Sequence, residues 1–126
     1  MIHYLSETQP ACTVEVGDQV WGMPHLCSCC LILVRTPHVI MAQHWPGTDP
    51  AMLDEDLFPA DPIEMLMVTG RETDYQIRQA HGLQLRYPTC LLYYYAYNTN
   101  DYPMPIQVAE EAFVLLNGGN YHPVAY

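Results

Sequence analysis

The chain contains no lysine, and this absence defines its charge. Four arginines stand against fourteen aspartate and glutamate residues, which gives the 126 residues a formal net charge of −10. Binding to the phosphates of a nucleic acid, or to an anionic membrane surface, requires a basic face. We therefore expect no nucleic acid and no membrane among the partners, but a protein substrate or protein partner with a basic surface.

Long apolar runs are also absent, and we expect no classical signal peptide. No segment approaches the roughly 20 residues of a membrane-spanning helix, and residues 1–7 lack the basic and apolar regions of a secretory signal peptide. The five cysteines are odd in number, and three of them fall within residues 27–30. A disulfide framework is even and spread out, so reduced thiols and a cytoplasmic location are expected. In a host cytosol, ubiquitination of lysine leads to removal of a protein, so the missing lysine suits delivery into that compartment. Compositional bias is the simpler explanation of the missing lysine.

Short apolar or alternating segments predict five strands. They lie at residues 11–16, 29–34, 39–45, 63–68 and 89–97, and turn-forming residues bound most of them. The tetrapeptide Arg35-Thr36-Pro37-His38 is turn-like, so the second and third segments are predicted to form a β-hairpin.

Helices are predicted at two places. Thr69 and Glu72 match the capping-box pattern, and Gly82 is placed to end a helix over about residues 70–81. Residues 106–116 carry apolar side chains near helical spacing, with a strand at 112–116 as the competing interpretation. The order of elements predicts an α+β fold, in which one or two helices pack on a face of a mostly antiparallel sheet. The length leaves room for a single domain, residues 1–126.

The hairpin contains the residues from which we predict chemistry. If Val34 and Val39 close its turn, Cys29 lies opposite His44 and Cys30 lies on the other face, opposite Gln43. Side chains opposite each other on antiparallel strands are about 5 Å apart. An imidazole at that distance can hold a thiol as the thiolate, which is a nucleophile.

Two other interpretations of the hairpin remain open. A slip of one residue would pair Cys30 with His44, and both side chains could simply end two core strands. Zinc is a further alternative, since six side chains here are potential ligands: His25, Cys27, Cys29, Cys30, His38 and His44. The spacing lacks a Cys-x-x-Cys pair, however, so we predict neither a metal nor a cofactor.

A family resemblance supports the enzymatic interpretation. Leu26-Cys27-Ser28-Cys29, then an apolar strand, a turn and a strand ending in His44, resembles the Cys-His protein glutamine deamidases. These include the cytotoxic necrotizing factor toxins and the bacterial chemoreceptor deamidases. The likeness covers about residues 26–45, and beyond them only the outline of strand, helix and strand is similar.

The resemblance implies a Cys-His hydrolase acting on carboxamides, with Cys29 as nucleophile and His44 as base. The third, orienting group is left open, with Thr13 and Glu15 as polar candidates on the preceding strand, and Gln43 or Trp45 is expected to shape the entrance. The alternative is a non-enzymatic acidic interaction protein, such as an immunity protein, inhibitor or adaptor, that binds a basic partner surface.

Overall fold

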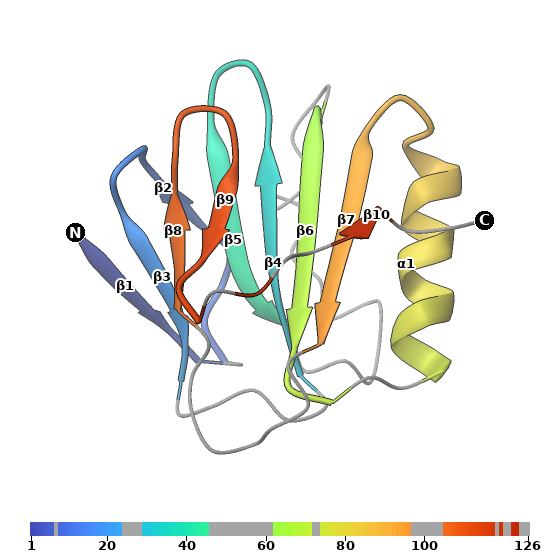
Figure 1. The fold of residues 1–126 in the computed structure, drawn as a ribbon, viewed down its shortest axis with the longest axis horizontal. Coiled ribbons are helices and arrows are strands. Elements are labelled where there is room, and N and C mark those ends of the chain that lie inside the picture. The colour runs from blue at the N-terminus through green and yellow to red at the C-terminus, as the bar shows by residue number, and fades with distance from the viewer. Residues whose placement is uncertain are drawn as a thin grey trace.

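The computed structural model describes residues 1–6, 8–23, 29–45, 62–71, 74–96, 105–117 and 119, and the backbone of 122–123. Two sheets and one helix form within these residues (Figure 1). The four-stranded sheet has the order β1 (Ile2–Leu5), β3 (Gln19–Gly22), β8 (Pro105–Val108), β9 (Phe113–Leu115). The six-stranded sheet has the order β10 (His122–Pro123), β7 (Leu91–Ala96), β6 (Glu64–Thr69), β4 (Cys30–Arg35), β5 (Ile40–Trp45), β2 (Cys12–Val14).

The helix and the smaller sheet cover opposite faces of the six-stranded sheet. Leu31 and Leu33 of β4 join a core cluster with β3, β8 and β9, while Ile32 and Val34 join a second cluster with helix α1 (Asp74–Arg86). Figure 1 shows α1 at the right and the four-stranded sheet at the left. A strand covered on both faces is apolar throughout, which explains the unbroken apolar sequence of β4.

The predicted α+β class is confirmed. Of the eight strand pairings in the described part of the chain, β1–β3 and β6–β7 are parallel and the other six are antiparallel. The parallel pair β6–β7 is joined by α1, as a crossover connection requires. Among the described residues, no helix is long and apolar enough to cross a membrane.

The predicted bounds of the first helix are wrong at both ends. The helix begins at Asp74 and runs through Gly82 to Arg86. Thr69 cannot cap it, because this residue is the last of β6 and its hydroxyl contacts the Cys29 carbonyl at 2.8 Å. Gly82 is exposed and does not have the positive φ that lets a glycine end a helix, so the helix continues past it. Pro88, two residues beyond Arg86, cannot continue the helix.

The second predicted helix does not form. Residues 105–108 and 113–115 are the strands β8 and β9, paired through Val108 and Phe113, so the competing strand at 112–116 was correct and β8 was not predicted. Apolar side chains at helical spacing misled the prediction, because Ile106, Val108, Phe113 and Leu115 also alternate within two short strands facing the core.

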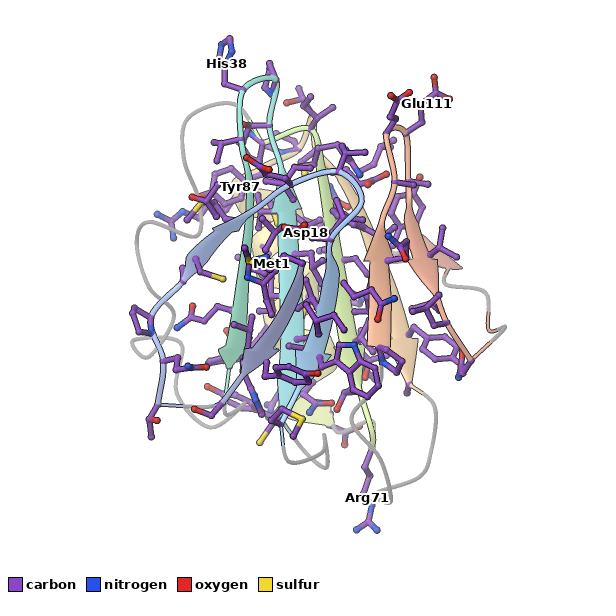
Figure 2. The ribbon with its side chains drawn as sticks, turned by 90° about the vertical axis from the view of Figure 1, so that its left-hand side faces the viewer. Met1, Asp18, His38, Arg71, Tyr87 and Glu111 are labelled. Carbon is purple, nitrogen blue, oxygen red and sulfur yellow. The ribbon has the colours of Figure 1, made fainter. Side chains whose placement is uncertain are left out.

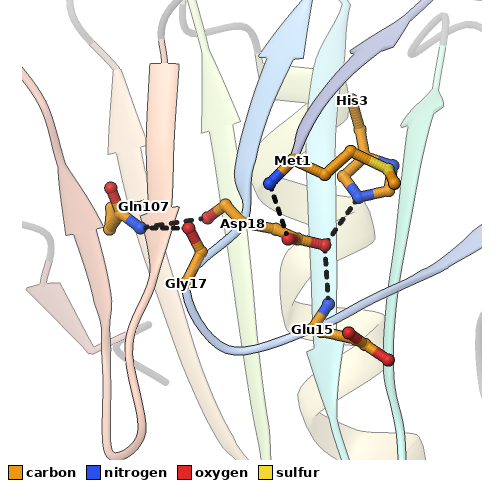
Figure 3. Close-up of polar contacts among 6 residues, drawn as sticks. All are labelled: Met1, His3, Glu15, Gly17, Asp18 and Gln107. Atoms are coloured by element: carbon orange, nitrogen blue, oxygen red, sulfur yellow. Dashed lines mark hydrogen bonds and ion pairs between the residues drawn. The ribbon is translucent and has the colours of Figure 1, made fainter.

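Asp18 fixes β1 against the start of β3. Its carboxylate accepts hydrogen bonds from the α-amino group of Met1 (3.2 Å), the backbone N–H of Glu15 (3.0 Å) and Nε2 of His3 (2.7 Å), as Figure 3 shows. These contacts hold the pKa of Asp18 at about 2, with the His3 hydrogen bond as the largest cause. Because β1 ends at Leu5, this cluster also helps to place the Leu5 carbonyl.

We expect Asp18→Asn to lower stability at neutral pH, and the deficit to disappear in acid. The folded-state pKa lies below the ordinary value of 3.8, so the stabilisation is complete above that pH and is lost as the pH falls towards 2. Thermal unfolding of both proteins across this range measures the effect. A deficit that stays constant down to pH 2 would show that the charge of Asp18 does not cause it.

Candidate functional site

The hairpin register differs from the prediction by two residues. Leu31, not Cys29, lies opposite His44, and Cys30 lies opposite Trp45. The prediction placed Arg35 in the turn, whereas Arg35 is the last residue of β4 and pairs with Ile40. The predicted direct pairing of Cys29 with His44 is therefore wrong.

The turn chemistry explains the shift. Thr36 and Val39 close the turn, because the Thr36 N–H donates to the Val39 carbonyl at 3.0 Å. The Thr36 hydroxyl also accepts from the Val39 N–H at 3.0 Å and lies 2.9 Å from its carbonyl. Only Pro37 and His38 then form the loop, so Val39 lies opposite Thr36 and not opposite Val34, which is a shift of two residues.

A shift of two residues leaves Cys29 and His44 on the same face of the sheet. Side chains alternate along a strand, so His44 faces the same way as Ala42, and Cys29 the same way as Leu31. Leu31 and Ala42 belong to the core between the sheets, and Cys29 packs against it. Cys29 is thus a diagonal neighbour of His44, at a typical Cα separation of about 7–8 Å.

His44 is more deeply buried than Cys29. His44 is only 2% exposed, whereas Cys29 is half-buried at the start of β4. This end of the sheet is the lower one in Figure 2, where Arg71 is labelled. Cys29 is therefore the more accessible of the two residues, and His44 is buried in the core.

A backbone carbonyl orients the His44 ring. The Leu5 carbonyl oxygen lies 2.9 Å from His44 Nδ1 and also accepts the Met23 N–H at 2.8 Å. A carbonyl can only accept, so Nδ1 carries the proton, and in the neutral ring Nε2 is the basic nitrogen. The carbonyl of Leu5 in the second sheet thus has the orienting role for which the sequence suggested side chains.

The two suggested orienting residues lie elsewhere. Thr13 pairs with Met41 and its hydroxyl donates to the Met41 sulfur at 3.4 Å, which places it on the opposite face of the sheet from His44. The Glu15 side chain is exposed beyond the end of β2. No sequence pattern identifies Leu5, because the contact depends on a backbone atom of another sheet.

Cys29 and Cys30 lie on opposite faces of the sheet. Cys30 is fully buried on the helix-facing side, and burial raises the pKa of its thiol far above the usual value, although a Thr69 hydrogen bond opposes this. A thiol that stays protonated is a poor nucleophile. Cys29 is accordingly the better candidate of the pair.

Cys12 offers a natural comparison with Cys29. It lies opposite Ala42 on β2, so it too is a diagonal neighbour of His44, on the same face. It is half-buried like Cys29, and burial raises the pKa of its thiol. Substitution of Cys12 is therefore a matched control for substitution of Cys29.

Buried polar side chains hold the backbone of Cys29. The Thr69 hydroxyl lies 2.8 Å from the Cys29 carbonyl and accepts from Gln76 Nε2 at 3.2 Å. Gln76 Oε1 in turn accepts from the Tyr94 hydroxyl at 3.3 Å. Thr69 and Gln76 are both 0% exposed, so the position at which β4 begins is rigidly determined.

The residues expected at the entrance do not lie there. Gln43 and Trp45 alternate with His44 and so face the helix side, where Trp45 is fully buried and its ring centroid is 6.3 Å from that of Tyr75. The two-sided burial of the sheet explains the error, since both faces of β5 are covered.

The proposed zinc ligands do not come together as a set. His38 lies in the hairpin turn, at the opposite end of β4 from Cys29 (Figure 2). Cys30 is on the other face of the sheet from His44, and His25 and Cys27 lie outside the described residues. Among the residues with described side chains, no three His, Cys, Asp or Glu side chains are grouped as metal ligands.

The geometry defines an α+β protein with a partly buried cysteine and an oriented, buried imidazole on one face of a sheet. Comparisons with protein-family models, with curated proteins and with solved structures found no match. The function is therefore argued from the site itself.

Proposed function

We propose that the chain is a Cys-His hydrolase acting on carboxamides, with the glutamine side chains of proteins as substrates. The observation that carries the proposal is the shared face of Cys29 and His44, with Nδ1 of the ring bonded to the Leu5 carbonyl. With the proton on Nδ1, Nε2 is the nitrogen that would accept the proton of the thiol.

The reaction would proceed in two steps at Cys29. His44 takes the thiol proton, the sulfur attacks the amide carbon, and the carbon–nitrogen bond breaks as His44 returns the proton to the departing ammonia. Water then cleaves the thioester, with His44 as base, and the products are a glutamate carboxylate and the free thiol. The Leu5 carbonyl keeps the ring in the required tautomer throughout.

The charge supports a protein as substrate. A net charge of −10 attracts basic protein surfaces and raises encounter rates with them. The resemblance of residues 26–45 to glutamine deamidases favours the same substrate, and the lack of lysine suits work in a host cytosol.

The second candidate is a non-enzymatic acidic interaction protein. The same charge of −10 favours it, together with the near-complete burial of His44, since a buried histidine often serves only packing and hydrogen bonding. The two candidates differ in whether Cys29 reacts.

Ammonia release tests the proposal. Glutamine-containing basic proteins are incubated with the protein, and ammonia is measured with and without added hydroxylamine. We expect ammonia release, and formation of γ-glutamyl hydroxamate when hydroxylamine competes with water for the thioester. Prior alkylation of Cys29 should abolish both products.

Two outcomes would contradict the proposal. The first is the absence of ammonia with every glutamine-containing substrate, which would leave the interaction protein. The second is ammonia release that persists after mass spectrometry shows Cys29 to be fully alkylated.

A further inference from the structure

A groove of about 510 Å³ opens at the end of the molecule opposite to Cys29. It lies between the residues that follow β2, the turn between β4 and β5, and the turn between β8 and β9. Figure 2 labels His38 and Glu111, from the two turns, at this upper end. The volume is within the range of about 300–1,000 Å³ that ligand sites occupy.

Part of the groove lining is apolar. Val14 and Ile40 are buried within it, while Val16 is 51% exposed and Ile63 is 45% exposed. Exposed β-branched side chains beside a concave surface offer contact area to the apolar part of a ligand.

Two carboxylates give the groove its charge. Glu15 and Glu110 line it and are exposed, and neither side chain takes part in an ion pair within the described part of the chain. Figure 3 shows the Glu15 carboxylate directed away from Asp18, whose carboxylate accepts from the backbone N–H of Glu15.

The one arginine in the lining does not offset this charge. Arg35 donates to the carbonyls of Ala109 (2.8 Å), Glu110 (3.1 Å) and Ala112 (3.3 Å), and its Nε lies 3.5 Å from Glu64. Its side chain is only 13% exposed. The guanidinium therefore braces the β8–β9 turn, and a cation from outside would meet Glu15 and Glu110.

The strand beside the groove is suited to an extended ligand. β2 is the outermost strand of the six-stranded sheet and pairs with β5 on its inner side. Thr13 and Val14 of this strand line the groove. Extended peptides commonly bind by lying along such an edge.

From these features we infer that the groove binds an extended basic segment of a partner protein, in which a lysine or arginine stands beside an apolar residue. The aliphatic stem of the cation packs on Val16 and Ile63, its charged end meets Glu15 and Glu110, and the segment follows β2. A second copy of this chain does not fit, because two molecules of charge −10 repel each other.

The inference is independent of the Cys29 chemistry and gives the acidic surface a specific location. Fluorescence anisotropy with a labelled peptide of alternating valine and arginine tests it, with a valine–glutamate peptide as the negative probe. We expect the valine–arginine peptide alone to bind, and Glu15→Gln with Glu110→Gln to weaken its binding by about tenfold.

Glu111 provides the matched control. It is exposed and adjacent to Glu110 in the same turn, but it does not line the groove. Glu111→Gln removes the same charge, so binding should change by less than about twofold. Glu110→Gln alone should weaken binding by about threefold.

Three results would overturn the inference: no binding of the valine–arginine peptide, equal losses for Glu110→Gln and Glu111→Gln, or self-association through this face. Equal losses would mean attraction by the overall charge rather than by the groove. Ammonia release is unaffected by these outcomes, so failure of the groove and failure of the hydrolase proposal are distinguishable.

Discussion

Cys29→Ser is expected to reduce ammonia release by at least about 10³-fold. A serine hydroxyl in the same position remains protonated near neutral pH, and an imidazole activates it less well than it activates a thiol. The substitution is small and the site is half-buried, so the protein should stay folded. Initial rates with a single basic glutamine-containing protein measure the loss.

Cys12→Ser is the control for this prediction. Cys12 has the same diagonal relation to His44 and a similar burial. We expect its substitution to leave the rate within about twofold of the original. An equal loss in both variants would mean that the effect comes from packing and not from a nucleophile.

Arg35→Ala is expected to lower the free energy of unfolding by about 3–5 kcal/mol. The guanidinium links β4 of the larger sheet to the β8–β9 turn of the smaller one through three carbonyls, and it lies 4.8 Å from the Phe113 ring centroid. Its removal also leaves Glu64 half-buried without this cation. Urea unfolding followed by tryptophan fluorescence measures the change.

The charge of Glu64 adds a pH dependence to this prediction. Burial raises the pKa of Glu64, and attraction to Arg35 opposes that rise. Without Arg35, the charged form of Glu64 is even less favoured in the folded protein. Lowering the pH should therefore protonate Glu64 and recover part of the lost stability.

Arg86→Ala is the matched control for Arg35→Ala. Arg86 is exposed in the last turn of α1, and its guanidinium lies 5.4 Å from the Tyr87 ring centroid. Its loss should cost less than about 1 kcal/mol. Similar losses for the two variants would contradict the bridging role of Arg35.

The strands with long apolar runs could be predicted from the sequence. β4 and β5 are covered on both faces, and β7 places Tyr93 and Tyr95 in one core and Tyr94 in the other. Such strands need β-branched, aromatic or other apolar residues at almost every position. Their sequence signal is therefore strong.

The smaller sheet could not be predicted in the same way. β1 and β3 have four residues each and are parallel to each other, and the chain between them passes through β2 of the other sheet. Short strands with alternating polar residues resemble loops in a sequence. The position of Leu5 beside His44 follows from this sheet and was missed with it.

The candidate site was predicted in part. The alternation of side chains preserved the shared face of Cys29 and His44, because the register error was an even number of residues. The hairpin register was predicted wrongly because the turn was placed wrongly. A polar Arg35 next to Thr36-Pro37 resembles a loop residue, and its partners lie about 75 residues away.

The alkylation rate of Cys29 tests the central claim most directly. Iodoacetamide labelling near neutral pH, followed site by site with mass spectrometry, compares Cys29 with Cys12 in the original protein and in His44→Gln. A thiolate held by an imidazole should react about tenfold faster than an ordinary thiol. The account predicts that Cys29 shows this advantage and that His44→Gln removes it; equal rates at the two cysteines, or a Cys29 rate unchanged by His44→Gln, would contradict it.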